Sequence, residues 1–286
     1  MKKLLAIVLT CLLMVTMLAA CGNSETPSTT AAPAETQPGA AETTAAQTEA
    51  AVPTFTTVAP GKLVMSTNAS FPPYEMVAAD GSLEGIDIDV AAAIAQKLGL
   101  ELQIDNMGFD ACILAVQQGK SDICMAGLTV TPERSAVMDF TDTYANGVQV
   151  VIVAANSDIA TLDDLANDKM IGTQMGTTGY IYCSDTVENG GYGEDHVVPY
   201  DDGAAAIQAL LKGQIDAVVI DNMPAQEYVA ANPGLKILDM EYANEDYAIG
   251  VAKGNTALLD AVNAALNELI ADGTVQSIVD KYISAN

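Results

Sequence analysis

The sequence predicts an α/β fold, and two features of the chain support that class. From about residue 61 onward, short β-like runs alternate with amphipathic helical runs, which is typical of α/β proteins with mostly parallel sheets. A helix, a glycine and an aspartate that opens an apolar strand also occur twice, at 113–123 and 207–217. Two similar lobes would explain this repeat, and two unrelated units of a common type would explain it equally well.

The first 58 residues predict an export signal and a tether. Lys2-Lys3, the apolar run 4–17 and the small residues after it form a signal that is too short to span a membrane. Leu18-Ala-Ala-Cys21 looks like a bacterial lipobox, in which the cysteine is acylated and becomes the mature N-terminus. A chance cysteine after an ordinary signal is the alternative. Residues 22–58 have no apolar period, which predicts a disordered tether. We therefore expect a signal peptide at 1–20, a tether at 21–58 that carries palmitate or a similar lipid on Cys21, and folded sequence from Gly61.

The charge and the cysteines exclude several kinds of partner. Without Lys2 and Lys3 the chain has 9 basic against 37 acidic residues, a formal charge of −28, which repels nucleic acid and anionic lipid head groups. The cysteines after Cys21 form no CxxC pair and do not neighbour the single histidine, which argues against a structural zinc site. Cys112 and Cys124 lie in apolar surroundings and are expected in the core, with a disulfide between them as the alternative.

The elements of the folded part are predicted from local patterns. Mostly apolar runs such as 148–153 predict buried strands, whereas the amphipathic run 87–98 predicts a helix. Gly99 and Gly119 end the first two helices, because glycine is favoured just beyond a helix C-terminus. The expected strands are 62–67, 100–104, 122–125, 148–153, 170–173, 216–220 and 247–252, and the expected helices are 87–98, 109–118, one after Gly176, 204–211, one from Pro224, 256–271 and 274–283.

Arg134 is the only arginine in the chain, and the residues around it predict an anion site. It follows a strand-like run at 123–126 and the small residues Gly127 and Thr129, and Pro132 suits the first turn of a short helix. This arrangement would present backbone N–H groups and a guanidinium to one carboxylate, which a guanidinium binds through two parallel hydrogen bonds. A solvent-exposed arginine on a surface loop is the alternative.

A carboxylate and two aromatic residues complete a set of groups that suits a zwitterion. Asp221 follows the strand 216–220, at the strand end where open α/β sheets bind their ligands. It could pair with an ammonium group or cap the helix that begins after it. Phe71 and Phe109 could form walls around an aliphatic side chain or simply fill the core.

The motifs of common enzyme classes are missing from the sequence. There is no Gly-x-Ser-x-Gly elbow, no His-Glu-x-x-His and no Walker loop, and the glycines at 172–179 fit neither phosphate-binding fingerprint. The single histidine, His196, lies in a loop-like stretch. We therefore expect no catalytic residue, no cofactor and no metal.

The segment 85–98 resembles the signature of the bacterial extracellular solute-binding proteins of family 3, the polar amino-acid type. Flanking segments agree with that family, and the resemblance extends from about Gly61 to the C-terminus. These flanking segments are 68–75, 126–134, 139–144, 176–178, 215–221 and 245–254.

The resemblance implies a role for each candidate residue. In that family an arginine holds the ligand α-carboxylate and an aspartate pairs with the α-ammonium, and the matching residues are Arg134 and Asp221. The other matching ligand contacts are the N–H and hydroxyl of Thr129, the carbonyl of Gly127, the aromatic pair Phe71 and Phe109, the helix-start pair Thr177 and Thr178, and the side-chain-end residues Asn68 and Gln174.

The sequence departs from the family pattern at the side-chain end of the pocket. Asn68 stands where basic amino-acid binders carry an acid, and Gln174 and Ile220 occupy positions that are charged or polar in glutamine-binding members. We therefore expect a neutral polar or sulfur-containing amino acid as the ligand.

The resemblance also implies a mechanism. It predicts a periplasmic-binding-protein-like (type II) clamp with two crossing hinge strands, whose lobes comprise 61–150 plus 249–286 and 151–248. We expect a lipid-anchored monomer on the outer face of the cytoplasmic membrane that closes on an L-amino acid and delivers it to an ABC permease and its ATPase subunit. A same-fold enzyme resembling cyclohexadienyl dehydratase and a ligand-sensing surface lipoprotein are the alternatives.

Overall fold

The computed structural model describes residues 55–283, so the expected signal peptide, the lipidation site Cys21 and most of the tether lie outside the described residues. Packing contacts begin slightly before the predicted start at Gly61, because the Val58 N–H donates to Asp122 Oδ1 over 2.8 Å. No helix within residues 55–283 is both long and apolar enough to cross a membrane.

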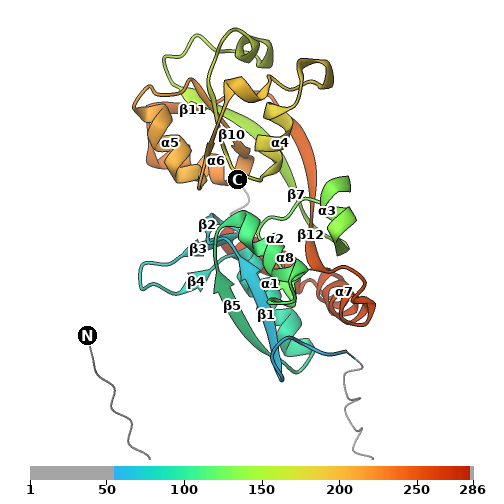
Figure 1. The fold of residues 1–286 in the computed structure, drawn as a ribbon. Helices are drawn as coiled ribbons and strands as arrows, with labels where there is room; N and C mark the ends of the chain where they lie inside the picture. Colours follow the sequence, from blue (N-terminus) through green and yellow to red (C-terminus); the bar gives the residue numbers. More distant parts are fainter. Residues whose placement is uncertain (1–54, 284–286) are drawn as a thin grey trace, which may run out of the picture. The chain divides into compact units, whose positions relative to one another are not determined.

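A mixed sheet of nine strands forms the centre of the described region (Figure 1). The strands are β1 (Lys62–Thr67), β5 (Glu101–Asn106), β6 (Ile123–Cys124), β7 (Met138–Ala154), β8 (Ile171–Gln174), β9 (Val197–Tyr200), β10 (Ala217–Asp221), β11 (Leu235–Ile237) and β12 (Ala243–Ala252). Their order is β5-β1-β6-β12-β7-β10-β8-β9, and β11 pairs with β7. A separate small sheet contains β2 (Ser70–Phe71), β3 (Glu75–Val77) and β4 (Leu83–Glu84).

The sequence pattern predicted a mostly parallel sheet, and this prediction is wrong for the large sheet. β1 pairs in parallel with β5 and β6, and β8 pairs in parallel with β9 and β10. Every pair that includes β7 or β12 is antiparallel. The reason is that β7 runs from one half of the sheet to the other and β12 runs back beside it, so the middle of the sheet is a pair of opposed strands.

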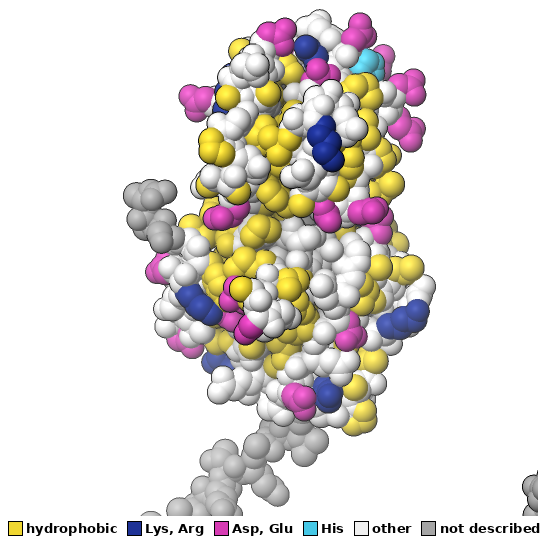
Figure 2. All heavy atoms as spheres, turned by 90° about the vertical axis from the view of Figure 1, so that its left-hand side faces the viewer, with side chains coloured by type: hydrophobic (Ala, Val, Ile, Leu, Met, Phe, Trp, Pro, Cys, Tyr) yellow, Lys and Arg dark blue, Asp and Glu magenta, His cyan; other side chains and the backbone are white. Residues whose placement is uncertain are grey.

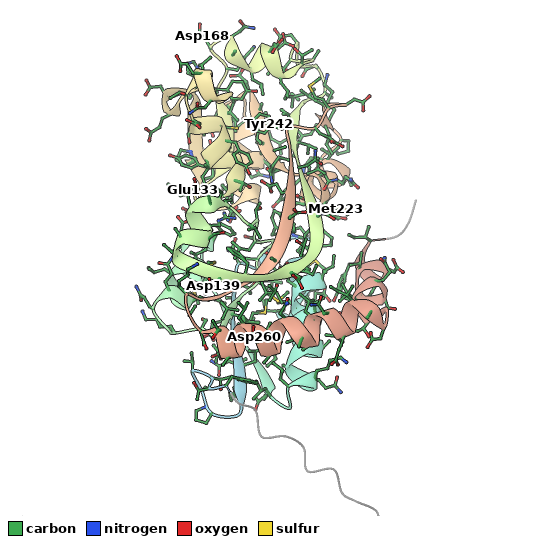
Figure 3. All side chains as sticks on the ribbon, turned by 90° about the vertical axis from the view of Figure 1, so that its right-hand side faces the viewer. Glu133, Asp139, Asp168, Met223, Tyr242 and Asp260 are labelled. Carbon is green, nitrogen blue, oxygen red and sulfur yellow. The ribbon has the colours of Figure 1, made fainter. Side chains whose placement is uncertain are left out.

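These two strands are longer than predicted and lie side by side (Figure 3). Their pairing extends from Ala243 opposite Gln149 to Ala252 opposite Met138, with register shifts on either side of Ala248. The sequence predicted only 148–153 and 247–252, because the polar residues before each apolar run hide the strand pattern. Hydrogen bonds across the pair extend β7 and β12 through these polar residues.

Helices pack on the sheet in two groups (Figure 1). α1 (Ile86–Lys97), α2 (Phe109–Gln117), α7 (Thr256–Ala271) and α8 (Thr274–Tyr282) accompany β1, β5 and β6, whereas α4 (Thr178–Ser184), α5 (Gly203–Leu211) and α6 (Asn222–Ala231) accompany β8 to β11. The short α3 (Pro132–Val137) lies beside β7. The predicted helix limits agree with the observed ones to within two residues.

Separate buried cores mark two lobes. Leu63, Ile94 and Leu266 belong to a core of the first lobe, and Ile152 and Val218 to a core of the second. The two-lobed α/β class is therefore confirmed, and the proposed changeovers at 150/151 and 248/249 stay a prediction. Cys112, Cys124 and Cys183 are buried free thiols, so the alternative of a Cys112–Cys124 disulfide is not the arrangement found.

The repeated helix–glycine–aspartate unit has the same geometry in both lobes. Gly119 and Gly213 follow α2 and α5 with φ angles of 64° and 65°. Asp122 then accepts the Val64 N–H over 2.8 Å, and Asp216 accepts the Met170 N–H over 2.8 Å. In each lobe the aspartate therefore ties the strand that it precedes to the start of a neighbouring strand.

The excess of acidic over basic residues in the sequence is visible on the surface. The formal net charge of the whole chain is −26, and acidic side chains outnumber basic ones on the face drawn in Figure 2. The ion pairs on the described surface, such as Lys97 with Glu268, are exposed and contribute little stability.

Steric crowding explains why position 85, the first of the family-like segment 85–98, is a glycine, and it leads to a prediction about stability. Gly85 precedes α1 with φ 138°, and a Cβ there would lie 2.2 Å from the Tyr74 carbonyl oxygen. Gly85→Ala should therefore lower the free energy of unfolding by at least about 2 kcal/mol. Gly81→Ala is the matched control, because Gly81 has φ 87° but open space around it, and should cost about 1 kcal/mol. Urea unfolding measures both, and equal midpoints for the two variants would contradict the steric explanation.

Candidate functional site

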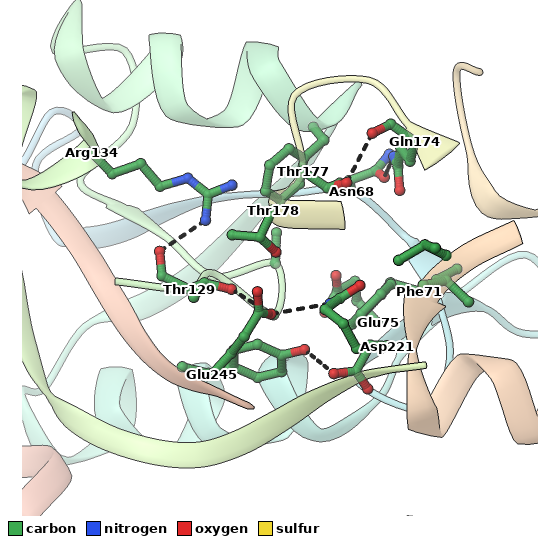
Figure 4. Close-up of a pocket in the computed structure, with 17 residues that line it drawn as sticks. Asn68, Phe71, Glu75, Thr129, Arg134, Gln174, Thr177, Thr178, Asp221 and Glu245 are labelled. Carbon is green, nitrogen blue, oxygen red and sulfur yellow. Dashed lines mark hydrogen bonds between the residues drawn. The ribbon is translucent and has the colours of Figure 1, made fainter. Parts of the chain in front are cut away.

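One cavity brings together all ten residues that the sequence assigned to ligand binding (Figure 4). Residues of both lobes line it. The ten are Asn68, Phe71, Phe109, Gly127, Thr129, Arg134, Gln174, Thr177, Thr178 and Asp221.

Arg134 reaches the cavity from the first turn of α3. Thr131 caps this helix by accepting the Arg134 N–H over 3.2 Å, and Pro132 occupies the first turn, where its missing N–H costs nothing. The Arg134 guanidinium lies 5.1 Å from the centre of the Phe109 ring. Helix start and ring together orient the side chain toward the cavity.

The guanidinium of Arg134 is buried without a carboxylate partner. Only 6% of the residue is exposed, and burial lowers its pKa from the ordinary value. Two of its five N–H donors are bonded, to the Thr129 carbonyl at 2.8 Å and to the Gly176 carbonyl at 3.2 Å. No carboxylate within residues 55–283 lies at salt-bridge distance from it. A buried cation with free donors favours an anionic ligand group.

The loop before Arg134 is pinned on both sides. The Val130 N–H donates to the Asp246 carbonyl over 3.1 Å, and the Leu128 carbonyl accepts the Ala248 N–H over 3.1 Å. Gly127 has φ 53°, and a Cβ there would lie 2.7 Å from the Phe71 ring. The Gly127 N–H donates to Asp87 Oδ2 over 2.9 Å, so the family-like segment 85–98 holds this loop in place.

Asp221 serves as a helix cap and also lines the cavity. Oδ1 accepts the Met223 N–H over 3.0 Å, which caps α6, and Oδ2 accepts the Val148 N–H over 3.0 Å and the Tyr247 hydroxyl. The residue is fully buried, and burial is the main reason why the pKa of Asp221 rises to about 6, with the nearby Glu245 adding to the rise. The two alternatives for Asp221 are thus compatible, because a capping carboxylate keeps a lone pair for a ligand.

The backbone of β7 leaves no room for a side chain beside Asp221, and this gives a second prediction. A Cβ on Gly147 would lie 2.3 Å from the Tyr247 hydroxyl and 2.5 Å from Asp221 Oδ2. Gly147→Ala should displace both groups and cost about 1–3 kcal/mol of stability. Gly234→Ala, with nothing within 4 Å of its added Cβ, should cost less than about 1 kcal/mol. Urea unfolding of both variants measures the difference, and equal stabilities would rule out the predicted clash.

Asn68 and Gln174 meet at another part of the cavity. Gln174 Nε2 donates to Asn68 Oδ1 over 2.9 Å and to the Asp201 carbonyl over 3.1 Å. Asn68 Nδ2 donates to the Met107 carbonyl over 2.9 Å. The side-chain carbonyl oxygen of Gln174, Oε1, accepts no hydrogen bond from the described residues, so it can receive one from a ligand. In Figure 4 these two amides lie away from Asp221 and Glu245.

The aromatic and threonine residues surround the remaining walls. Phe71 stacks on Tyr74 with ring centres 5.7 Å apart, and Phe109 is buried under the guanidinium. Thr177 caps α4 by accepting the Tyr180 N–H, and Thr178 begins that helix and is buried. Both phenylalanines therefore fill the core and also line the cavity, so the two roles considered for them, core filling and cavity wall, are compatible.

The two lobes are closed on each other around the cavity. Besides the Gln174–Asn68 bond, Arg134 reaches the Gly176 carbonyl, and the Tyr228 hydroxyl donates to the Ser70 carbonyl over 3.5 Å. Each of these bonds joins a residue of the first lobe to one of the second.

Sequence reasoning missed four polar or aromatic residues of the cavity wall. They are Glu75, Gln149, Glu245 and Tyr247. The sequence analysis predicted only the second half of the strand 243–252. Had the whole strand been predicted, the alternation of side chains would have placed residues 245, 247 and 249 on the same face. Glu75 is fully buried with neither carboxylate oxygen bonded among the described residues, and burial beside Asp87 raises its pKa well above the ordinary value.

Comparisons with known proteins agree with this fold. The family model of bacterial extracellular solute-binding proteins, family 3, matches residues 63–285. The chain is 33% identical over 234 residues to the ABC transporter arginine-binding protein 1 of Escherichia coli K12, which covers 80% of this chain and 93% of that protein.

Solved structures give the same result. An ancestral arginine-binding protein bound to arginine has a TM-score of 0.73 and 40% identity, covering 78% of this chain and 99% of that one. An ancestral arginine-binding protein bound to glutamine has a TM-score of 0.72 and 40% identity, covering 79% and 99%.

These relatives are named for binding and not for catalysis, in agreement with the prediction that the chain is not an enzyme. The family match covers most of the described residues, and both lobes of the fold have counterparts in the solved structures. This chain belongs to the bacterial extracellular solute-binding proteins of family 3.

Proposed function

We propose that this protein binds an L-α-amino acid between its lobes and delivers it to an ABC permease and its ATPase subunit. The observation that carries the proposal is the buried guanidinium of Arg134, which has free N–H donors and no carboxylate partner among the described residues. A ligand α-carboxylate would supply the missing charge and accept the bidentate pair that a guanidinium favours. The Thr129 N–H and the start of α4 at Thr177 and Thr178 would add donors to the same carboxylate.

The α-ammonium group of the ligand also has hydrogen-bond acceptors in the cavity. Asp221 and Gly127 line the cavity, and the carboxylate of the first and the carbonyl of the second can accept from an α-ammonium. Phe71 and Phe109 would enclose the aliphatic part of the side chain, because each presents an aromatic surface to the cavity.

The side chain of the ligand is proposed to be neutral and polar, with glutamine as the first candidate. Asn68 and Gln174 form an amide pair with a free carbonyl oxygen, and a ligand amide can donate to it. The carboxylates of the cavity wall, Glu75, Asp221 and Glu245, lie elsewhere in Figure 4. Arginine is the second candidate, because relatives bind it and its guanidinium also donates to a carbonyl.

A thermal-shift screen against the common amino acids tests this proposal. A ligand that binds only the folded state stabilises it by about 2.7 kcal/mol at a hundredfold excess over Kd. We expect the largest shift with L-glutamine or L-arginine and none with the D-enantiomers. A screen without any shift would reject amino-acid binding, and a shift with a sulfur-containing residue alone would reject the amide preference.

We also propose that the chain is a monomer held on the outer face of the cytoplasmic membrane by a lipid on Cys21. The lipobox-like segment ending at Cys21 and the polar tether after it support this. Cys21→Ala should move the protein from the membrane fraction to the soluble fraction, and an unchanged fractionation would count against the anchor.

A further inference from the structure

Glu245 is a buried carboxylate that lies near the Tyr182 hydroxyl, and one of its oxygens has no donor at hydrogen-bond distance among the described residues. It lies on β12 and is 5% exposed. Oε2 accepts the Thr129 hydroxyl over 3.0 Å and Gln149 Nε2 over 3.1 Å. Oε1 is buried and has no hydrogen-bond partner among the described residues. An unpaired buried carboxylate oxygen is costly, so its presence on a cavity wall indicates a missing donor.

The position of Glu245 identifies the part of the ligand that could supply this donor. Its carboxylate lies beside Thr129 and on the same side of the cavity as Asp221, whereas the Asn68–Gln174 pair lies elsewhere (Figure 4). The charge of Glu245 is close enough to raise the pKa of Asp221, and it also partly offsets the lowering of the Arg134 pKa by burial. Asp221 and Glu245 therefore border the place where the α-ammonium is proposed to bind. The third carboxyl of the wall, Glu75, has its pKa raised well above the ordinary value by burial, which favours its neutral form.

Asp221 alone has little capacity left for an ammonium group. Its oxygens already accept three protein hydrogen bonds, from Met223, Val148 and Tyr247, out of about four that a carboxylate can take. An ammonium group has three N–H donors. One lone pair of Asp221, the Gly127 carbonyl and Oε1 of Glu245 would together match that number.

We propose that Glu245 is the second anionic partner of the ligand's α-ammonium, and that it makes the site reject carboxylates that lack this group. This inference rests on the proposed amino-acid function and names a specificity-determining residue of the same site. A ligand without the ammonium would leave two buried carboxylates uncompensated, because Arg134 is matched by the ligand carboxylate. Discrimination then comes as much from this repulsion as from attraction.

A purely structural role is the competing explanation. Glu245 could simply hold Thr129 and Gln149 beside the hinge strands. Glu245→Gln separates the two, because glutamine has the same shape and keeps one oxygen for Thr129 and Gln149 while removing the charge. Asp246→Asn is a matched control, since it removes one charge from the next residue of β12, which is exposed.

The test uses the purified chain and calorimetric titration at about pH 7. The probes are L-glutamine with 4-carbamoylbutanoate, and L-arginine with 5-guanidinopentanoate, in which the second of each pair lacks only the α-ammonium. For Glu245→Gln we expect about tenfold or greater loss of affinity for the amino acid, with affinity for the analogue unchanged or improved. Asp246→Asn should leave both within about twofold.

A second readout is the stability of the ligand-free protein. Removing an unpaired buried charge should leave Glu245→Gln as stable as the unmodified chain or more so in urea. The inference is overturned if Glu245→Gln binds the amino acid within about threefold of the unmodified chain, or if amino acid and analogue lose affinity by the same factor. An unmodified chain that binds no amino acid would be seen before any variant is made, and it would overturn the proposed function itself.

Discussion

Arg134→Ala should reduce amino-acid affinity by about a hundredfold or more. The change removes two charge-assisted hydrogen bonds to the ligand carboxylate, each contributing about 1.5–3 kcal/mol, and leaves that carboxylate in a buried site without a cation. No other arginine exists in the chain, and no lysine lines the cavity, so nothing can replace it. Isothermal titration with the amino acid found in the thermal-shift screen measures the loss.

Two variants control this experiment. Lys120→Ala removes one positive charge from an exposed position of the same lobe and should leave the affinity within about twofold. Arg134→Lys keeps the charge but not the planar pair of donors, so it should fall between the unmodified chain and the alanine variant. Full affinity in a folded Arg134→Ala protein would disprove the assignment of Arg134 to the ligand carboxylate.

Amino-acid affinity should weaken about tenfold as the pH falls from about 7 to about 5. Burial raises the pKa of Asp221 to about 6, and only the ionised carboxylate attracts the ligand ammonium. At the lower pH about nine-tenths of this group is protonated, whereas the ligand α-carboxylate stays ionised. Titration calorimetry across this range measures the slope.

Asp221→Asn tests which group produces that slope. The variant should bind more weakly at about pH 7 and lose most of the pH dependence, while asparagine still caps α6. Asp87, whose pKa burial also raises to about 6, and Glu75, whose pKa burial raises well above the ordinary value, would produce any slope that remains. An unchanged slope in Asp221→Asn would show that Asp221 does not titrate in this range.

The stability of the ligand-free protein should change in the opposite direction. The folded-state pKa values of Asp221 and Asp87 lie above the ordinary aspartate value of 3.8, so the folded state binds more protons than the unfolded state between about 4 and 6. Their contribution to stability is therefore present at low pH and is lost as the pH rises through about 6. Urea midpoints that rise from about pH 7 to about pH 5 would agree with this sign.

Local patterns predicted most elements and about half of the ten candidate residues, and the family resemblance supplied the others. Neither predicted the full length of the hinge strands. Residues 139–147 of β7 contain Asp139, Thr141, Asp142 and Asn146, which read as loop residues. They form a strand because β12 supplies hydrogen-bond partners from a segment about a hundred residues later. No pattern within the segment reports that distant partner.

Glu245 was missed for the same reason. Its segment, 243–246, is polar on its own and gives no strand signal before Tyr247. Only the register with β7 places Glu245 beside Gln149 and on the wall of the cavity. Arg134 was found because its signal is local: a strand, small residues and a helix start within twelve residues of sequence.

The sequence by itself determined the α/β class and the helix limits, and it predicted an anion site around Arg134, because hydrophobic periodicity, glycine stops and helix capping act over a few residues. Only the tertiary structure decided that Asp221 and Glu245 share a wall of the cavity, that the middle of the sheet is antiparallel, and that Arg134 has no carboxylate partner within residues 55–283. These features depend on which distant strands pair and which charges become buried together, and chain folding settles both through long-range contacts.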